Sequence, residues 1–258
     1  MRDEPEKSRR RPGLGGMPLR AMAPNIVTML ALCAGLTGIR FALAERWEAA
    51  VLAIVVAGIF DGMDGAVARL LKATSRFGAE LDSLSDIAAF GIAPAIVLYA
   101  WTLHEISGIG WLIALAYAVC CALRLARYNA QMDDEAGPRK QLGFLTGVPA
   151  PVAAGLALTP LMIGFWTGKD EIITPTLTAI YLGGVSFLMV SNLPTFSFRQ
   201  MRLRRAYRLP LLVFVALFVA LLTSYTWITL ITCSVLYLGS LPLAWRMYRR
   251  ASARQQAA

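Results

Sequence analysis

The sequence predicts an all-α polytopic membrane protein with about eight membrane-spanning helices. Hydrophobic residues make up 57% of its 258 residues and charged residues 16%, and the mean hydropathy is +0.57. This is more apolar than a soluble domain of that length requires for its core. The apolar residues also come in runs of about 20, the length that a helix needs to cross the hydrocarbon of a bilayer. We therefore expect one helical membrane bundle.

Eight apolar stretches can be drawn along the chain. They cover residues 25–44, 48–69, 79–103, 108–128, 145–167, 173–194, 209–225 and 227–245. We expect the first six to form a core over residues 24–194 and the last two to form a C-terminal hairpin over residues 209–245, attached more loosely. The hairpin requires a tight turn from Ser224 to Trp227.

The segments outside these spans are basic. We expect residues 1–23 to form a basic N-terminal tail that touches anionic lipid, and residues 246–258 to form a C-terminal tail. Residues 195–208 carry five arginines. This segment is either an interfacial helix lying on anionic headgroups or a solvated basic loop.

The distribution of positive charge predicts the orientation. The net charge is +9, and all but three of the 25 Lys and Arg residues lie on one side of the predicted bundle. Because Lys and Arg concentrate on the cytoplasmic side of membrane proteins, we expect both termini to be cytoplasmic and the chain to lie in the inner (cytoplasmic) membrane. The basic residues sit at the ends of apolar runs instead of forming a face with aromatic residues, so nucleic acid is not expected as a partner.

Four aspartates lie within the second and third predicted spans, at Asp61, Asp64, Asp82 and Asp86. A carboxylate at membrane depth costs several kcal/mol unless it lines a polar cavity or has a partner. Each pair is spaced to share one face of a helix, and two facing helices would bring four acceptor-only groups together. Mg²⁺ and Mn²⁺ take carboxylate oxygens and share their other positions with phosphates, which predicts a two-metal site. The alternatives are a proton relay or cation transport.

Small residues surround the carboxylates and leave room for a bulky ligand near the backbone. They are Gly62, Gly65, Ala66, Ala68, Gly78 and Ala79. The alternative is that they only allow close helix packing. Arg69 follows Asp61 by two turns and is placed to hold a phosphate, although ordinary charge at the cytoplasmic end of a span explains it too.

These residues follow a known pattern: Asp61-Gly-Met-Asp64-Gly65-Ala-Val-Ala68-Arg69, eight residues, Gly78, three residues, Asp82, three residues, Asp86. The pattern resembles the signature of the CDP-alcohol phosphatidyltransferase family, with every fixed position filled. The resemblance implies that Asp61, Asp64 and Asp82 bind two divalent ions, Mg²⁺ or Mn²⁺, and that Asp86 touches metal and acts as the general base. It also implies a homodimer, with the active site facing the cytoplasm.

The same resemblance implies a pocket for the cytidine diphosphate of a CDP-lipid. Its residues would be Gly65, Ala68, Arg69 and Gly78, together with Asp61 and Asp82. Asn25 and Thr28, in a short Pro-Asn-x-x-Thr sequence at the start of the first span, resemble family positions beside the nucleotide phosphates. Capping of the first helix explains Asn25 equally well.

The expected mechanism is an in-line displacement at the lipid phosphorus, with no covalent enzyme intermediate. An alcohol is a poor nucleophile until a base removes its proton, and Asp86 would face the pyrophosphate that the metals hold. The metals would neutralise charge that develops on the leaving CMP.

Two further segments resemble the branch of the family that uses serine as acceptor. They are Arg124-Leu-Ala-Arg127-Tyr128-Asn129 and Phe144-Leu-Thr-Gly147-Val-Pro149-Ala-Pro151, the second with Val148 where leucine is usual. The resemblance implies CDP-diacylglycerol and L-serine as substrates. Arg127 would bind the serine carboxylate and Asn129 would accept from its ammonium group. Alternatively, both arginines only end a helix. We expect Pro149 and Pro151 to break the start of the fifth span.

Other acceptors stay open at this point. Choline, glycerol 3-phosphate and inositol phosphate would use the same reaction. From other classes, a cation-coupled transporter would also place aspartates in the membrane, as would a metal-dependent prenyl transferase. The fixed Gly, Ala and Arg positions favour a nucleotide over an ion, and the chain has no second Asp-rich motif for a prenyl diphosphate.

Overall fold

The computed structural model describes residues 19–71, 75–130, 144–168, 173–196 and 208–256. Its helical elements are α1 (Leu19–Leu43), α2 (Trp47–Leu71), α3 (Arg76–Asp86), the π-helix η1 (Ile87–Ile92), α4 (Ala93–Trp101), the 3-10 helix η2 (Leu103–Glu105), α5 (Ile109–Ala130), α7 (Ala150–Ala157), α8 (Thr159–Thr167), α9 (Pro175–Val190), α10 (Arg208–Ser224) and α11 (Thr226–Gln256). Two three-residue strands, β1 (Phe144–Thr146) and β2 (Pro194–Phe196), pair antiparallel.

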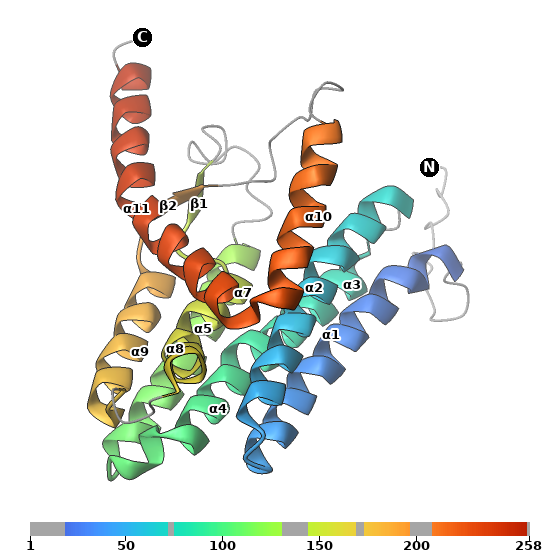
Figure 1. Cartoon of the computed structure of the whole chain (residues 1–258). Coiled ribbons are helices and arrows are strands. Elements are labelled where there is room, and N and C mark those ends of the chain that lie inside the picture. Colours follow the sequence, from blue (N-terminus) through green and yellow to red (C-terminus); the bar gives the residue numbers. More distant parts are fainter. Residues whose placement is uncertain (1–18, 72–74, 131–143, 169–172, 197–207, 257–258) are drawn as a thin grey trace, which may run out of the picture.

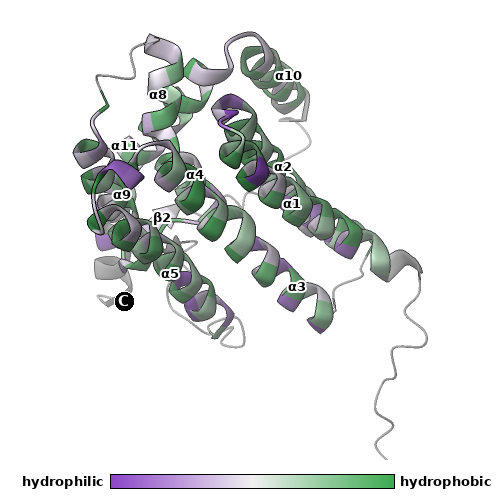
Figure 2. Ribbon diagram, turned by 90° about the horizontal axis from the view of Figure 1, so that it is seen from below, coloured by the Kyte–Doolittle hydropathy of each residue, from purple (hydrophilic) through white to green (hydrophobic). Residues whose placement is uncertain are grey.

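The membrane prediction is confirmed. Within the described residues, six helical segments are long and apolar enough to cross a membrane: Met22–Leu43, Trp47–Leu71, Arg76–Trp101, Ile109–Ala130, Ala150–Thr167 and Thr226–Arg249. Pro175–Val190 and Leu212–Ser224 are shorter apolar helices. Each of the eight predicted stretches therefore corresponds to a helical segment of the structure. Figure 2 shows hydrophobic residues along most of these helices, with hydrophilic positions on α3 and near the end of α5.

The helices run back and forth between two ends of the bundle. Figure 1 shows the described start of α1, the end of α11 and the β1–β2 pair at one end, and the connections from α1 to α2 and from α4 to α5 at the other. The start of α1 and the end of α11 therefore lie at the same end of the bundle, and which side of a membrane this end faces stays a prediction.

Close packing of α1 against α2 and the third span positions the site. A Cβ added at Gly35 would lie 2.6 Å from the Cα of Ala89, and one at Gly38 would lie 3.1 Å from the carbonyl oxygen of Ala50. Small residues at such crossings let backbones approach closely in a membrane, where dispersion contacts replace the hydrophobic effect. The approach brings the first turns of α1 beside the carboxylate-bearing parts of α2 and α3.

The start of the fifth span differs from the prediction. Residues 145 and 146 belong to β1, where Leu145 pairs with Thr195, and the helix begins only at Ala150. Pro149 is the residue that precedes the helix, which confirms that a proline shapes this entry. A proline has no N–H to donate, so it fits the start of a helix but not its interior.

The two helices of the C-terminal hairpin contact different parts of the protein. The tight turn is confirmed, because α10 ends at Ser224 and α11 starts at Thr226. α10 packs chiefly on α11, but α11 packs on α7, α8 and β2 of the core. Within the described residues, α10 thus contacts mainly its partner in the hairpin, and α11 joins the hairpin to the core. Most of the basic segment 195–208 lies outside the described residues.

Candidate active site

Three aspartates from two helices converge at one point. Asp61 and Asp64 come from α2, and Asp82 comes from α3. One carboxylate oxygen of each lies within 4.8 Å of the other two. Oxygen ligands of Mg²⁺ or Mn²⁺ lie about 2.1 Å from the ion, so two of them on opposite sides are about 4 Å apart. The donor set and its spacing fit a divalent cation.

Asp86 is a neighbour of this trio. Its carboxyl group lies within hydrogen-bonding reach of Asp61, and it also interacts electrostatically with Asp82. Four carboxyl groups so close together require cations or protons to offset their repulsion. Asp86 is outside the trio whose oxygens lie within 4.8 Å of one another, and its predicted roles as a metal contact and as the general base stay predictions.

Thr28 positions one of the carboxylates. Its hydroxyl donates to Oδ2 of Asp64 at 2.7 Å, and both residues are buried. The hydroxyl of Ser85 in turn donates to the carbonyl oxygen of Thr28 at 3.2 Å. These bonds join α1, α2 and α3 directly behind the carboxylates. Sequence reasoning placed Thr28 beside the nucleotide phosphates and missed Ser85, for which the sequence offers no signal beyond its place next to Asp86.

Asn25 lies inside α1 and does not cap it. The helix begins at Leu19, so the capping alternative for Asn25 is wrong. Its side chain faces Gly78 instead, because a Cβ added at Gly78 would come within 2.8 Å of Asn25 Oδ1. The N–H of Gly78 donates to the hydroxyl of Ser75, the N-cap residue of α3, at 3.0 Å. Only glycine leaves this approach to the start of α3 open.

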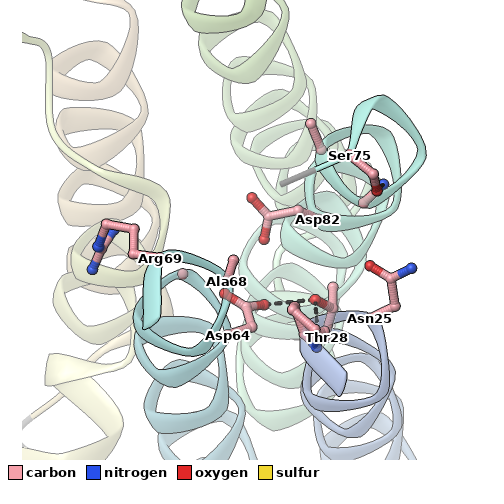
Figure 3. Close-up of a pocket in the computed structure, with 11 residues that line it drawn as sticks. Asn25, Thr28, Asp64, Ala68, Arg69, Ser75 and Asp82 are labelled. Atoms are coloured by element: carbon pink, nitrogen blue, oxygen red, sulfur yellow. Dashed lines mark hydrogen bonds between the residues drawn. The ribbon is translucent and has the colours of Figure 1, made fainter. Parts of the chain in front are cut away.

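A pocket of about 190 Å³ opens beside the carboxylates. It is lined by Pro24, Asn25, Thr28, Asp64, Gly65, Ala68, Arg69, Ser75, Gly78, Ala79 and Asp82. Every residue predicted to bind the nucleotide belongs to this lining except Asp61. Figure 3 shows the hydrogen bond between Thr28 of α1 and Asp64 of α2, with Asp82 of α3 nearby. Arg69 lies on the opposite side of Asp64 from Thr28.

The predicted acceptor residues make contacts within the protein. The guanidinium of Arg127 donates to the carbonyl oxygens of Val190 at 2.8 Å and Ser191 at 3.3 Å and to Oδ1 of Asn192 at 3.3 Å. It therefore holds the end of α9. The amide nitrogen of Asn129 donates to the hydroxyl of Ser83 at 2.8 Å, next to Asp82. Their roles in acceptor binding stay predictions.

The fold and the site define a polytopic membrane protein that can hold a divalent cation beside an open pocket lined by small residues. A family model described as CDP-alcohol phosphatidyltransferase matches residues 21–190, and a second, described as CDP-alcohol phosphatidyltransferase 2, matches residues 206–242. The chain belongs to the CDP-alcohol phosphatidyltransferase family.

Three bacterial relatives of the chain carry the same name. A CDP-diacylglycerol–serine O-phosphatidyltransferase from Mycobacterium leprae is 38% identical over 234 residues, which are 91% of this chain and 78% of the relative. Proteins of the same name from Helicobacter pylori and Bacillus subtilis are 33% identical over 202 residues and 35% identical over 170 residues. These matches cover 77% and 66% of this chain, and 80% and 87% of the two relatives.

Proposed function

We propose that the chain transfers the phosphatidyl group of CDP-diacylglycerol to the hydroxyl of L-serine, giving phosphatidylserine and CMP. The observation that carries this is the aspartate trio at the edge of the pocket, in a chain whose relatives bear the name of that reaction. Carboxylate-held cations that share phosphate oxygens suit the transfer of a phosphoryl-linked group.

The four aspartates and Thr28 have different proposed roles. Asp61, Asp64 and Asp82 would hold Mg²⁺ or Mn²⁺, and we propose two ions. Bound cations supply charge neutralisation at the phosphates. Thr28 keeps Asp64 oriented through its 2.7 Å hydrogen bond. Asp86 removes the proton of the acceptor hydroxyl as the oxygen attacks phosphorus, since an alcohol is a weak nucleophile without a base.

The nucleotide would occupy the pocket between α1, α2 and α3. Gly65, Ala68 and Gly78 leave the backbone accessible there, and Asn25 offers an amide opposite Gly78. Arg69 is exposed at the end of α2 and lines the same pocket, where its guanidinium suits a phosphate oxygen.

We also propose that the site faces the cytoplasm of the inner membrane, with both termini on that side and the chain forming a homodimer. The excess of Lys and Arg flanking one end of the spans supports the orientation. A water-soluble amino acid and a nucleotide would both reach the carboxylates from that side.

The test is CMP release by the purified full-length protein with CDP-diacylglycerol, Mg²⁺ or Mn²⁺, and a panel of acceptors. We expect release with L-serine, and loss of it when the metal is chelated. Release with glycerol 3-phosphate, choline or inositol phosphate but not with serine would overturn the acceptor assignment. Metal-dependent ion uptake into vesicles without CMP release would favour a cation-coupled transporter.

A further inference from the structure

Arg124 in α5 lies across from Asp86, and two contacts fix this register. The buried hydroxyl of Tyr117 donates to the carbonyl oxygen of Phe90 at 2.9 Å. Further along α5, Asn129 donates to Ser83 at 2.8 Å. The order of these contacts makes α5 antiparallel to the third span. Arg124 follows Tyr117 by about two turns and so lies on the same face of α5, between the two contacts, where it interacts electrostatically with Asp86.

The guanidinium of Arg124 keeps one N–H donor, at Nε, that forms no hydrogen bond with the described residues. This nitrogen is buried. The side chain interacts electrostatically with Asp86 and Asp61. A buried donor without a partner is unfavourable, more so on a charged group, and such a donor is satisfied when a ligand of opposite charge arrives. The guanidinium of Arg127, three residues further along α5, already donates hydrogen bonds to the end of α9.

The C-terminal hairpin contributes a second group to the same place. Tyr237 lies in α11, which packs on β2. Its hydroxyl oxygen is buried, near Thr195 of β2 and within electrostatic reach of Arg124. A helix outside the predicted six-span core thus places a polar group near Arg124.

We propose that Arg124 and Tyr237 bind the carboxylate of the acceptor and thereby select an amino acid over a neutral alcohol. This inference rests on the proposed function. The planar guanidinium takes a carboxylate through two parallel hydrogen bonds, and the tyrosine hydroxyl adds a third donor. With its carboxylate held there, the acceptor presents its hydroxyl to Asp86 on the facing helix.

The reaction balances with this placement. Asp86 takes the proton from the acceptor hydroxyl, and the acceptor oxygen forms a bond to the phosphorus that carries the diacylglycerol. The bond from that phosphorus to the oxygen bridging to CMP breaks, and CMP leaves with the electron pair. Arg124 and Tyr237 are specificity residues in this scheme and exchange no proton.

The experiment compares L-serine with L-serinamide, which keeps the hydroxyl and the ammonium group but lacks the carboxylate. In the full-length enzyme we expect Arg124→Gln to lower kcat/KM for serine by about 10- to 100-fold, mainly through KM, because a charge-assisted pair is lost. We expect little change for serinamide and an unchanged KM for CDP-diacylglycerol. Arg124→Lys keeps the charge without the fork and should fall between the wild type and Arg124→Gln.

Tyrosine variants test the second residue. Tyr237→Phe should raise KM for serine several-fold. Tyr181→Phe is a matched control, because Tyr181 also buries its hydroxyl beside a threonine, Thr159, but does so on α9. We expect Tyr181→Phe to leave both acceptors unaffected.

The outcomes separate this inference from the proposed function. Equal losses for serine and serinamide in Arg124→Gln, or near-wild-type behaviour of Arg124→Lys with both, would show that Arg124 only offsets the charge of the aspartates. If the wild type ignores serine and uses glycerol 3-phosphate, the function fails, but a raised KM for that anion in Arg124→Gln still supports an anion site. Use of an uncharged acceptor such as glycerol, unaffected by Arg124→Gln, would overturn the inference.

Discussion

The two sides of the candidate site differ in how their polar groups are satisfied. On the metal side, between α1, α2 and α3, the side chains bind one another: Thr28 donates to Asp64, and Ser85 donates to the backbone of Thr28. On the proposed acceptor side, where Arg124 of α5 interacts with Asp86, the Nε of Arg124 lacks a hydrogen-bond partner among the described residues. The polar groups of the proposed metal side are therefore already paired within the protein, whereas the proposed acceptor side keeps a buried donor that a ligand would satisfy.

The metal side should be the more sensitive to single changes. We expect Asp82→Asn to lower CMP release by about 1,000-fold or more, because a neutral amide replaces a charged ligand of the cation. The matched control is Glu80→Gln, an exposed carboxylate of the same helix, which should retain activity. Activity of Asp82→Asn close to that of the control would remove Asp82 from the metal site.

Asp86 lies where the two sides meet. We expect Asp86→Asn to lower kcat by about 100- to 10,000-fold, the range attributed to general base catalysis. Binding of CDP-diacylglycerol, measured separately with metal present, should persist, since the trio of ligands is intact. Loss of that binding along with turnover would assign Asp86 to the metal instead.

Thr28 tests how far the metal side depends on its supporting hydrogen bond. We expect Thr28→Val to weaken the apparent metal affinity by about 10- to 100-fold, because partners that orient a ligand have effects of that size. Excess Mg²⁺ should restore much of the activity, and Thr28→Ser should behave like the wild type. An unchanged metal requirement in Thr28→Val would mean that the bond to Asp64 is dispensable.

Arg127 should show the smallest effect on the reaction. Its contacts with Val190, Ser191 and Asn192 predict that Arg127→Gln lowers stability in detergent by about 1–3 kcal/mol. The serine KM of the folded fraction should not change. Arg40→Gln, an exposed arginine at the end of α1, serves as the control for loss of one positive charge. A raised serine KM in Arg127→Gln would return Arg127 to the acceptor site.

The proposed metal side could be predicted from the sequence because buried charge in a membrane costs so much free energy. A carboxylate inside a membrane is unfavourable unless it has a partner or lines a polar cavity. The spacings of three and four residues also place each pair of aspartates on one face of a helix. The pocket residues followed from glycines and alanines at fixed distances from those aspartates. Thr28 was predicted as a site residue because its short motif resembles that of the family. Its hydrogen bond to Asp64 depends on how α1 packs against α2, and the sequence does not reveal that packing.

The acceptor side could not be resolved in the same way. Arg124 and Arg127 are three residues apart, which separates them by about 60° around a helix, and both obey the rule for cytoplasmic positive charge. Only the tertiary contacts distinguish them, since one faces Asp86 and the other ends α9. Similarly, Leu145 looked like the start of an apolar span, and its pairing with a strand about 50 residues later overrode that pattern.

The π-helix η1 places a wide turn in the third span, directly after Asp86. A π-turn holds more residues than an α-turn, and η1 stands directly between Asp86 and α4. Deleting one residue from Ile87–Ile92 would convert this wide turn into an ordinary α-helical turn, so that Asp86 and α4 would keep nearly the same relative rotation but lose the widening between them. A one-residue deletion in this hexapeptide should therefore disturb the fold less than the same deletion in α3 or α4, and it would test whether the wide turn next to Asp86 is needed for activity.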